Sequence, residues 1–373
     1  TADGFIELTS AGPQQTRGKE LSAREVLEAG AAKLETDARI DPILRIELLR
    51  TLADVEIQLG LHENAGRHLD AALQIGARFD PAALDYVTLT RVMLLNARSE
   101  NAASEQLSAQ LLARIDHGID GLESLQRVTF FIARANALHV LGRGEEALAM
   151  CTRALADLAS LPSTPEAERW RANAYGQMGQ VLQNLGRIDD AERYLRQTLE
   201  LALKLDLDPF RISRDENNLA GVLAVRGRFR EALALHQASI PRFVQSLGSE
   251  HPEYPLRINN LGMTEFGAGK LEDARTHLAQ AVELIRTRFD AGNHIVLTLQ
   301  SNHALVLAAA GEFERAEALA EAALNGMQAK MPATSLPLIR AARTAAIVAF
   351  EHAKPDRAQT RFRACVDGLL AAK

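Results

Sequence analysis

The chain has 373 residues and a formal net charge of −6, and 47% of its residues are hydrophobic, 24% charged and only 5% aromatic. This hydrophobic content excludes a disordered chain, and two cysteines are too few for a disulfide scaffold. The negative charge argues against a basic nucleic-acid binder. The longest apolar run, Ala304 to Ala310, is far shorter than the ~20 residues that span a bilayer. We therefore expect a folded chain that neither binds nucleic acid nor inserts into a membrane.

A repeat of about 42 residues fills most of the chain, and in it a small residue is followed five positions later by alanine. The pairs are Gly60/Ala65, Ala97/Ala102, Gly142/Ala147, Gly186/Ala191, Gly227/Ala232, Gly269/Ala274, Gly311/Ala316 and Ala353/Ala358. Two further columns of small residues keep the same phase, seven positions after each alanine and twelve before it. Small side chains let two antiparallel helices approach closely, and a turn glycine supplies the positive φ that ends the first helix.

The elements follow in chain order from these signals. Residues 1–40 form a lead-in whose capping helix begins at the capping box of Ser22 and Glu25. From residue 41 on, apolar residues recur at intervals of three and four, which predicts helices, and no segment alternates with period two for long enough to form a strand. Starts of first helices are predicted where a capping residue precedes proline, at Asp41-Pro42, Asp80-Pro81, Thr164-Pro165 and Asp208-Pro209. Because one helix pair cannot bury its own apolar face, the pairs must stack into one all-α solenoid over residues 41–373.

Pro241 lies inside the second helix of the fifth repeat, where it removes a backbone hydrogen bond, so we expect a kink or an early end of that helix. Cys151 and Cys365 fall at packing positions of the third and eighth repeats, too far apart for a disulfide. Two unpaired cysteines favour a reducing compartment.

The columns resemble those of the tetratricopeptide repeat. The period of about 42 residues resembles the long-helix variety of kinesin light chains, as do the phrases Gly248-Ser249-Glu250-His251-Pro252, Asn217-Asn218-Leu219-Ala220 and Asn259-Asn260-Leu261-Gly262. The resemblance covers residues 42–373. It implies a right-handed α-solenoid of about eight antiparallel helix pairs, with the first helices lining a concave groove.

The lead-in followed by repeats also resembles the region after the catalytic domain in bacterial serine/threonine protein kinases that carry C-terminal tetratricopeptide repeats. In many of these kinases a membrane helix precedes the repeats. The resemblance therefore implies a sensor or docking domain on the periplasmic side of a membrane-anchored bacterial protein, with the cytoplasm as the alternative location. Another multidomain regulator with such repeats is the alternative source of the chain.

The sequence carries no catalytic motif. It lacks the Gly-rich, His-Arg-Asp and Asp-Phe-Gly motifs of kinases. Gly267-Ala268-Gly269-Lys270 lacks the other residues of a phosphate loop, and the ten histidines show no zinc-protease spacing. We therefore expect a non-catalytic chain with no cofactor and no metal site.

The resemblance places particular first-helix residues in the groove when the alanine column sets the phase. The residues predicted to bind a peptide are Asn136, His139, Asn173, Gln180, Gln183, Asn184, Arg214, Asn217 and Asn259, and the same positions elsewhere hold Arg50, Asp54, Met263, Arg340 and Arg343. Amides both donate and accept hydrogen bonds, which suits an extended peptide. The alternatives are a solvated face or hydrogen bonds between helices, and the 42-residue spacing of Asn218, Asn260 and Asn302 indicates such a ladder.

The predicted function is therefore binding of a protein or peptide in the concave groove. Arg50 and Asp54 stand where the family's carboxylate clamp has a lysine and an asparagine, which argues against binding of chaperone tails. The alternative function is self-association that brings catalytic domains together.

Overall fold

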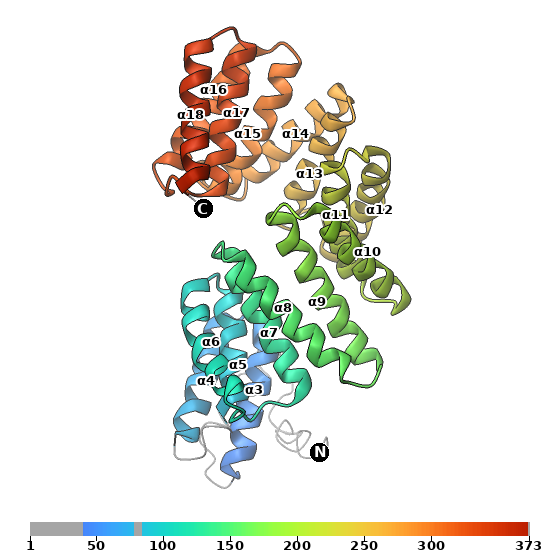
Figure 1. The fold of residues 1–373 in the computed structure, drawn as a ribbon, viewed down its shortest axis with the longest axis vertical. Coiled ribbons are helices and arrows are strands. Elements are labelled where there is room, and N and C mark those ends of the chain that lie inside the picture. The colour runs from blue at the N-terminus through green and yellow to red at the C-terminus, as the bar shows by residue number, and fades with distance from the viewer. Residues whose placement is uncertain (1–39, 78–83, 372–373) are drawn as a thin grey trace, which may run out of the picture. The chain divides into compact units, whose positions relative to one another are not determined.

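The computed structural model describes residues 40–77 and 84–371, and every regular element in these residues is a helix (Figure 1). The sixteen helices of this described part form eight successive helix–turn–helix repeats, which confirms the predicted all-α class. The lead-in with its predicted capping helix and the Asp80-Pro81 pair lie outside the described residues.

The chain divides into two compact units, Thr1–Leu185 and Gly186–Lys373. Unit 1 contains α3 (Pro42–Gln58), α4 (His62–Gly76), α5 (Asp85–Ala97), α6 (Asn101–Asp116), α7 (Ser124–Val140), α8 (Gly144–Ala159) and α9 (Pro165–Asn184). Unit 2 contains α10 (Ile188–Lys204), α11 (Pro209–Val225), α12 (Phe229–Leu247), α13 (Tyr254–Gly267), α14 (Leu271–Arg286), α15 (His294–Ala309), α16 (Phe313–Gln328), α17 (Leu336–Glu351) and α18 (Pro355–Ala371). Odd-numbered helices are the first helices of their repeats, and even-numbered helices are the second.

Three of the predicted helix starts are confirmed by side-chain caps. A carboxylate oxygen of Asp41 accepts from the N–H groups of Ile43 (3.0 Å) and Leu44 (3.1 Å) at the start of α3. Thr164 caps α9 and Asp208 caps α11 in the same way. In each case proline follows, where the helix needs no N–H donor.

The small-residue columns form the contacts between paired helices. The alanines at the first column are fully buried in six repeats: Ala65, Ala147, Ala191, Ala232, Ala274 and Ala316. Gly262, twelve residues before Ala274, faces α14 so closely that a Cβ atom on it would lie 2.9 Å from Leu278 Cγ. The pattern read from the sequence is thus a packing pattern, because larger side chains here would hold the helices apart.

The register of the second repeat differs from the sequence prediction. The turn residue with positive φ is Ser99 (φ 61°) and not Ala97, and the buried residue five positions later is Ser104, whereas Ala102 is exposed. Ser104 donates to the carbonyl of Val92 (3.5 Å). The prediction was wrong by two residues because serines replace both marker residues in this repeat. With Ser99, the eight turn residues lie 39 to 44 residues apart.

The expected early end of α12 at Pro241 is wrong, since the helix continues through this residue to Leu247. The alternative expectation, a kink at Pro241, stays a prediction. Proline at this position removes the bond to the carbonyl of Gln237. Both Pro241 and Gln237 are exposed, so water can hydrate the carbonyl and the helix need not end.

Both cysteines are free and buried, as predicted from their packing positions. Burial raises the pKa of Cys151 to about 12. This thiol is therefore protonated and unreactive at neutral pH.

The turn residues provide a reciprocal test of stability. Among the described residues, apart from Gly269 (φ 78°) and its chain neighbours, no atom lies within 4 Å of the place where a Cβ of Gly269 would lie, and Ala353 holds the equivalent turn with φ 55°. Because an L side chain disfavours this backbone region, Gly269→Ala should lower the free energy of unfolding by about 1 kcal/mol, and Ala353→Gly should raise it by a similar amount. Urea titrations followed by circular dichroism measure both changes, and shifts of the same sign would contradict the assignment.

Candidate peptide-binding face

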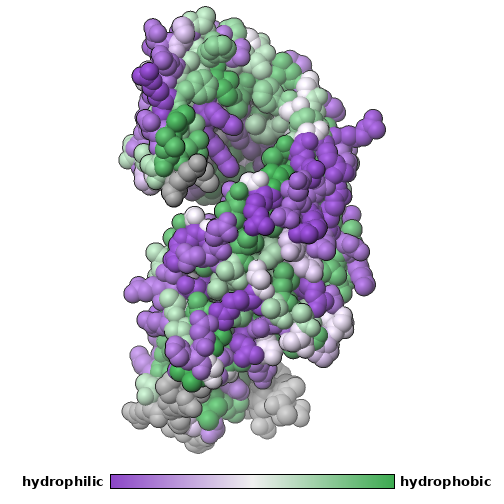
Figure 2. All heavy atoms as spheres, in the orientation of Figure 1, coloured by the Kyte–Doolittle hydropathy of each residue, from purple (hydrophilic) through white to green (hydrophobic). Residues whose placement is uncertain are grey.

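The first helices form the inner side of each unit. In unit 1, α3, α5, α7 and α9 contact one another in sequence, and in unit 2 the same holds for α11, α13, α15 and α17. Within the described residues, no two second helices of a unit approach as closely. Long side chains bridge them instead, as in the ion pairs Arg153–Asp116 (2.8 Å) and Arg196–Glu231 (3.4 Å). Hydrophilic residues gather accordingly over α10 and α12 (Figure 2).

Unit 1 has a hollow of about 220 Å³ on this inner face. We call it the Tyr86 hollow. It is lined by α3, α5, the loop before α7 and the first turn of α7, and its residues are Ile43, Ile46, Glu47, Arg50, Tyr86, Val87, Gly121, Glu123 and Gln126.

A stacked ion pair forms one wall of the Tyr86 hollow. The Arg50 guanidinium lies 3.8 Å from the centre of the Tyr86 ring, forms an ion pair with Asp54 one turn further along α3, and donates to the Thr51 hydroxyl (3.0 Å). Only 13% of the Arg50 side chain is exposed. Arg50 is therefore held in place by two neighbours and an aromatic face.

Burial has the largest effect on the pKa values of Asp54 and Tyr86 in this wall. It raises the pKa of the Asp54 carboxyl against the opposing attraction of Arg50. It also raises the pKa of the Tyr86 phenol; Arg50 opposes this, and the carboxylates of Asp54, Glu123 and Glu166 add to it. Four charged groups thus act on the Tyr86 hydroxyl, and three of them are negative.

Tyr86 and Asn96 are inner-face residues that the sequence analysis missed. Counted back from Ser104, Tyr86 stands where Asn173 stands in its repeat, and Asn96 stands where His139 stands. Asn96 donates to the Ala133 carbonyl of the next first helix (2.8 Å). The sequence pattern set the register of this repeat by Ala102 and not by Ser104. It therefore assigned these two inner-face positions to residues that lie two places earlier in the chain.

The predicted groove residues on α7 and α9 differ in their bonding and burial. Asn184 Nδ2 lies 3.2 Å from His139 Nε2, which joins α9 to α7, and burial lowers the pKa of His139. Asn136 is exposed and Gln180 and Gln183 are half-buried; in the described part of the chain their amides form no hydrogen bonds. Asn173 is half-buried on α9.

In unit 2 the predicted groove residues take part in a ladder of asparagines. Asn302 donates to Asn259 (3.0 Å), Asn259 to Asn260 (3.3 Å), and Asn260 to Asn217 (3.3 Å). This chain of amides links α15, α13 and α11. Asn260 and Asn302 thus lie in a ladder as predicted, but their partners are Asn217 and Asn259 and not Asn218.

Within the described residues of unit 2, no side-chain bond brings the other predicted positions together. Arg214 forms an ion pair with its neighbour Asp215 (3.1 Å), and Met263 packs against a buried apolar cluster. Arg340 and Arg343 are exposed on α17.

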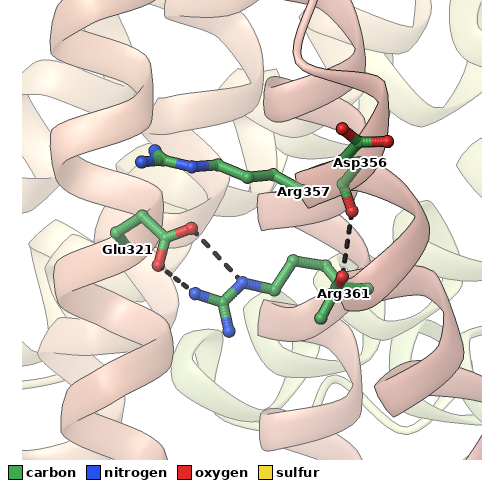
Figure 3. A pocket seen from close by; sticks show the side chains of 5 residues that line it. Glu321, Asp356, Arg357 and Arg361 are labelled. Carbon is green, nitrogen blue, oxygen red and sulfur yellow. Dashed lines mark hydrogen bonds and ion pairs between the residues drawn. The ribbon is translucent and has the colours of Figure 1, made fainter.

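A second hollow, of about 470 Å³, lies between the second helices α16 and α18 (Figure 3). Arg361 donates to both carboxylate oxygens of Glu321 (3.3 and 2.5 Å), and Arg357 forms an ion pair with Glu317 (2.6 Å). Because Glu321, Arg357 and Arg361, three of the four charged residues of its described lining, already take part in ion pairs, this hollow offers less to a ligand than the Tyr86 hollow.

Two further kinds of feature are absent from the described residues. Among them, no three metal-binding side chains lie together, and no helix has the length and apolar character that crossing a membrane requires. The absence of enzyme activity stays a prediction.

Tetratricopeptide-repeat family models match residues 216–287, 171–205, 129–151 and 297–322. They confirm that the chain contains tetratricopeptide repeats. A search of curated proteins found no match. The resemblance to the kinase region stays a prediction.

Solved structures share the fold at low sequence identity. A Rap protein complexed with Competence and Sporulation Factor has 11% identity and a TM-score of 0.63, covering 88% of this chain and 99% of that one. NprR in complex with its cognate peptide NprX has 14% identity and a TM-score of 0.62, covering 87% and 88%. A signal transduction ATPase with a tetratricopeptide repeat sensor from Pyrococcus horikoshii has 12% identity and a TM-score of 0.59, covering 95% of this chain and 54% of that one. At these identities the likeness shows the fold alone.

Proposed function

We propose that the chain is a non-catalytic binding domain that holds an extended peptide against the inner face of unit 1. The observation that carries the proposal is the Tyr86 hollow, which lies on the same face as unbonded amides of α7 and α9. NprR, which shares the fold, is described with its cognate peptide, and this supports the proposal.

The amides explain how a helical surface can hold a peptide backbone. The backbone groups of a helix interior bond to one another, so only side chains can pair with the N–H and C=O groups of an extended peptide. Asn136, Gln180 and Gln183 each offer two donor hydrogens and an acceptor oxygen. We therefore expect these three residues to contact the peptide backbone.

A selection experiment tests the proposal. A phage-displayed library of random peptides is selected on the purified chain, and a synthetic copy of a selected peptide is titrated by calorimetry. We expect the variant with Asn136→Ala, Gln180→Ala and Gln183→Ala to bind at least about tenfold more weakly, because each lost hydrogen bond costs about 1 kcal/mol.

The matched control is the variant with Gln74→Ala, Gln106→Ala and Gln110→Ala, which removes three exposed amides from the second helices α4 and α6. It should bind as the wild type does. Failure to select any peptide, or equal affinities of all three proteins, would refute binding at this face.

We further propose that the domain is the sensor or docking region of a bacterial serine/threonine kinase on the periplasmic side of a membrane. The support is the sequence resemblance of the lead-in and repeats. The coding sequence upstream of Thr1 tests this part, since a kinase domain followed by an apolar span of ~20 residues is expected there.

A second candidate function, self-association, is favoured by an apolar stripe on α18. Phe362, Val366 and Leu369 are 41%, 51% and 45% exposed. In α16 the equivalent residues Ala320, Leu324 and Met327 are buried in the cluster that includes α17 residues. The stripe of α18 is therefore the same helix-packing surface without a cover in the described residues.

The charged residues beside this stripe are complementary to those of a second copy of the chain. If two α18 helices pack antiparallel about a twofold axis near Val366, Arg363 of each copy lies against Asp367 of the other. Because the surface is small, we expect a weak dimer.

Sedimentation velocity at concentrations up to about 200 µM tests the dimer, where weak association becomes visible. Val366→Glu should give a monomer, and Val225→Glu, at an exposed position on α11, should leave the dimer intact. A wild-type chain that stays monomeric over this range would refute self-association through α18.

A further inference from the structure

The charges around the Tyr86 hollow are unbalanced. Glu47 and Glu123 line it with exposed side chains, and Asp54 and Glu166 also act on the Tyr86 hydroxyl. The only cationic residue among the described lining is Arg50. Arg50 is already paired with Asp54 and stacked on Tyr86, so it cannot neutralise the remaining carboxylates. The hollow therefore attracts positive charge.

The hollow has apolar walls and an acidic rim. Ile43, Ile46 and Val87 line it together with the Tyr86 ring. Lysine and arginine combine an apolar stem with a charged head, so one such side chain satisfies both parts of the surface. A volume of about 220 Å³ leaves room for one long side chain.

Two rim residues are held in place for this contact. Glu123 and Gln126 form a capping box at the start of α7, in which the Glu123 carboxylate accepts from the backbone N–H of Gln126. In return the N–H of Glu123 donates to Gln126 Oε1 (2.9 Å). This bond uses the amide oxygen of Gln126, so its amide hydrogens can donate to a ligand. A peptide carbonyl next to the bound side chain is a suitable acceptor.

We propose that the Tyr86 hollow binds a lysine or arginine side chain of the peptide. Its head group pairs with Glu47 and Glu123, its stem packs on Ile43 and Ile46, and Gln126 donates to the neighbouring peptide carbonyl. This inference rests on the proposed function and adds the chemical class of the ligand. An anionic group is disfavoured because it would face the carboxylates, and Arg50, the one guanidinium among the described lining residues, is already paired.

The test uses the peptides selected on the wild-type chain. We expect them to share a lysine or arginine, and replacing that residue by glutamine should weaken binding about tenfold at low ionic strength, with the difference shrinking as salt is added. Because the protein is unchanged in this comparison, no loss of folding can imitate the result.

A charge swap on the protein locates the contact. Glu47→Lys should weaken binding of the cationic peptide and restore binding of a peptide in which the shared residue is glutamate. Glu145→Lys, at an exposed position on the second helix α8, should change neither affinity.

The outcomes separate this inference from the proposed function. If peptides bind but tolerate glutamine at the cationic position within twofold, or if Glu47→Lys has no effect, the cationic site is refuted and peptide binding stands. If no peptide binds at all, both are refuted.

Discussion

Replacing Gly262 by valine is expected to lower the free energy of unfolding by roughly 3 kcal/mol, at the upper end of what overpacking a core costs. A Cβ atom at this position would lie 2.9 Å from Leu278 Cγ and 3.4 Å from the backbone oxygen of Ala274. Leu278 is fully buried and cannot turn to solvent, and the Ala274 oxygen belongs to the backbone of α14. The two helices must therefore separate.

Urea titration of Gly262→Val measures this loss, and Leu278→Ala provides the matched rescue. The double variant should lose less free energy of unfolding than the two single variants lose together, because the smaller residue at position 278 leaves room for the valine. Ala279→Val, at an exposed position on α14, should change stability by less than about 0.5 kcal/mol. Strict additivity of Gly262→Val and Leu278→Ala would show that the two residues do not meet.

The second large effect is a loss of stability in mild acid caused by His236. This residue of α12 is fully buried, and its Nε2 lies 3.1 Å from the Thr264 hydroxyl. Burial, assisted by the nearby Arg257, lowers its pKa from 6.5 to about 4. The unfolded chain therefore takes up a proton below pH 6.5 while the folded chain does not, and unfolding becomes more favourable.

Because the pKa of His236 is lower in the folded chain than in the unfolded chain, the free energy of unfolding keeps its full value above pH 6.5. It falls progressively as the pH is lowered from 6.5 to about 4. The size is about 3 kcal/mol, from some 1.4 kcal/mol for each unit of the pKa difference. The free energy of unfolding of His236→Gln should therefore fall less between pH 7 and pH 4.5 than that of the wild type. His294→Gln, at an exposed position, should keep the wild-type slope. Parallel profiles for wild type and His236→Gln would contradict a buried neutral histidine.

The helix pairs could be predicted because their signals are local and repeated. A cap followed by proline starts α3, α9 and α11, and in six of the eight repeats alanine at a fixed offset from a turn glycine marks the helix crossing. The prediction for the second repeat was wrong because its turn residue is Ser99 and the buried residue at its helix crossing is Ser104. Serine is small enough for the helix crossing, and at the turn it adopts the positive φ at some cost in backbone strain. It does not match a glycine–alanine pattern, whereas Ala97 and Ala102 have the spacing of one.

The same error hid part of the site. Arg50 and Asp54 were placed on the inner face from sequence, whereas Tyr86, which Arg50 covers, was not. The use of Asn217 and Asn259 in a ladder could not be predicted either, because an amide that binds a peptide and one that bridges two helices have the same spacing in sequence. Only the distance to the neighbouring helix separates them.

The central claim is that the first helices of unit 1 form the binding surface, and photo-crosslinking tests it most directly. A selected peptide that carries benzoylphenylalanine in place of a residue next to its lysine or arginine is irradiated with the wild-type chain, and the linked residues are located by mass spectrometry. The account predicts crosslinks on α3, α5 and α7 around Tyr86, which an excess of unlabelled peptide removes. Competable crosslinks confined to the second helices α4, α6 and α8, or to unit 2, would contradict it.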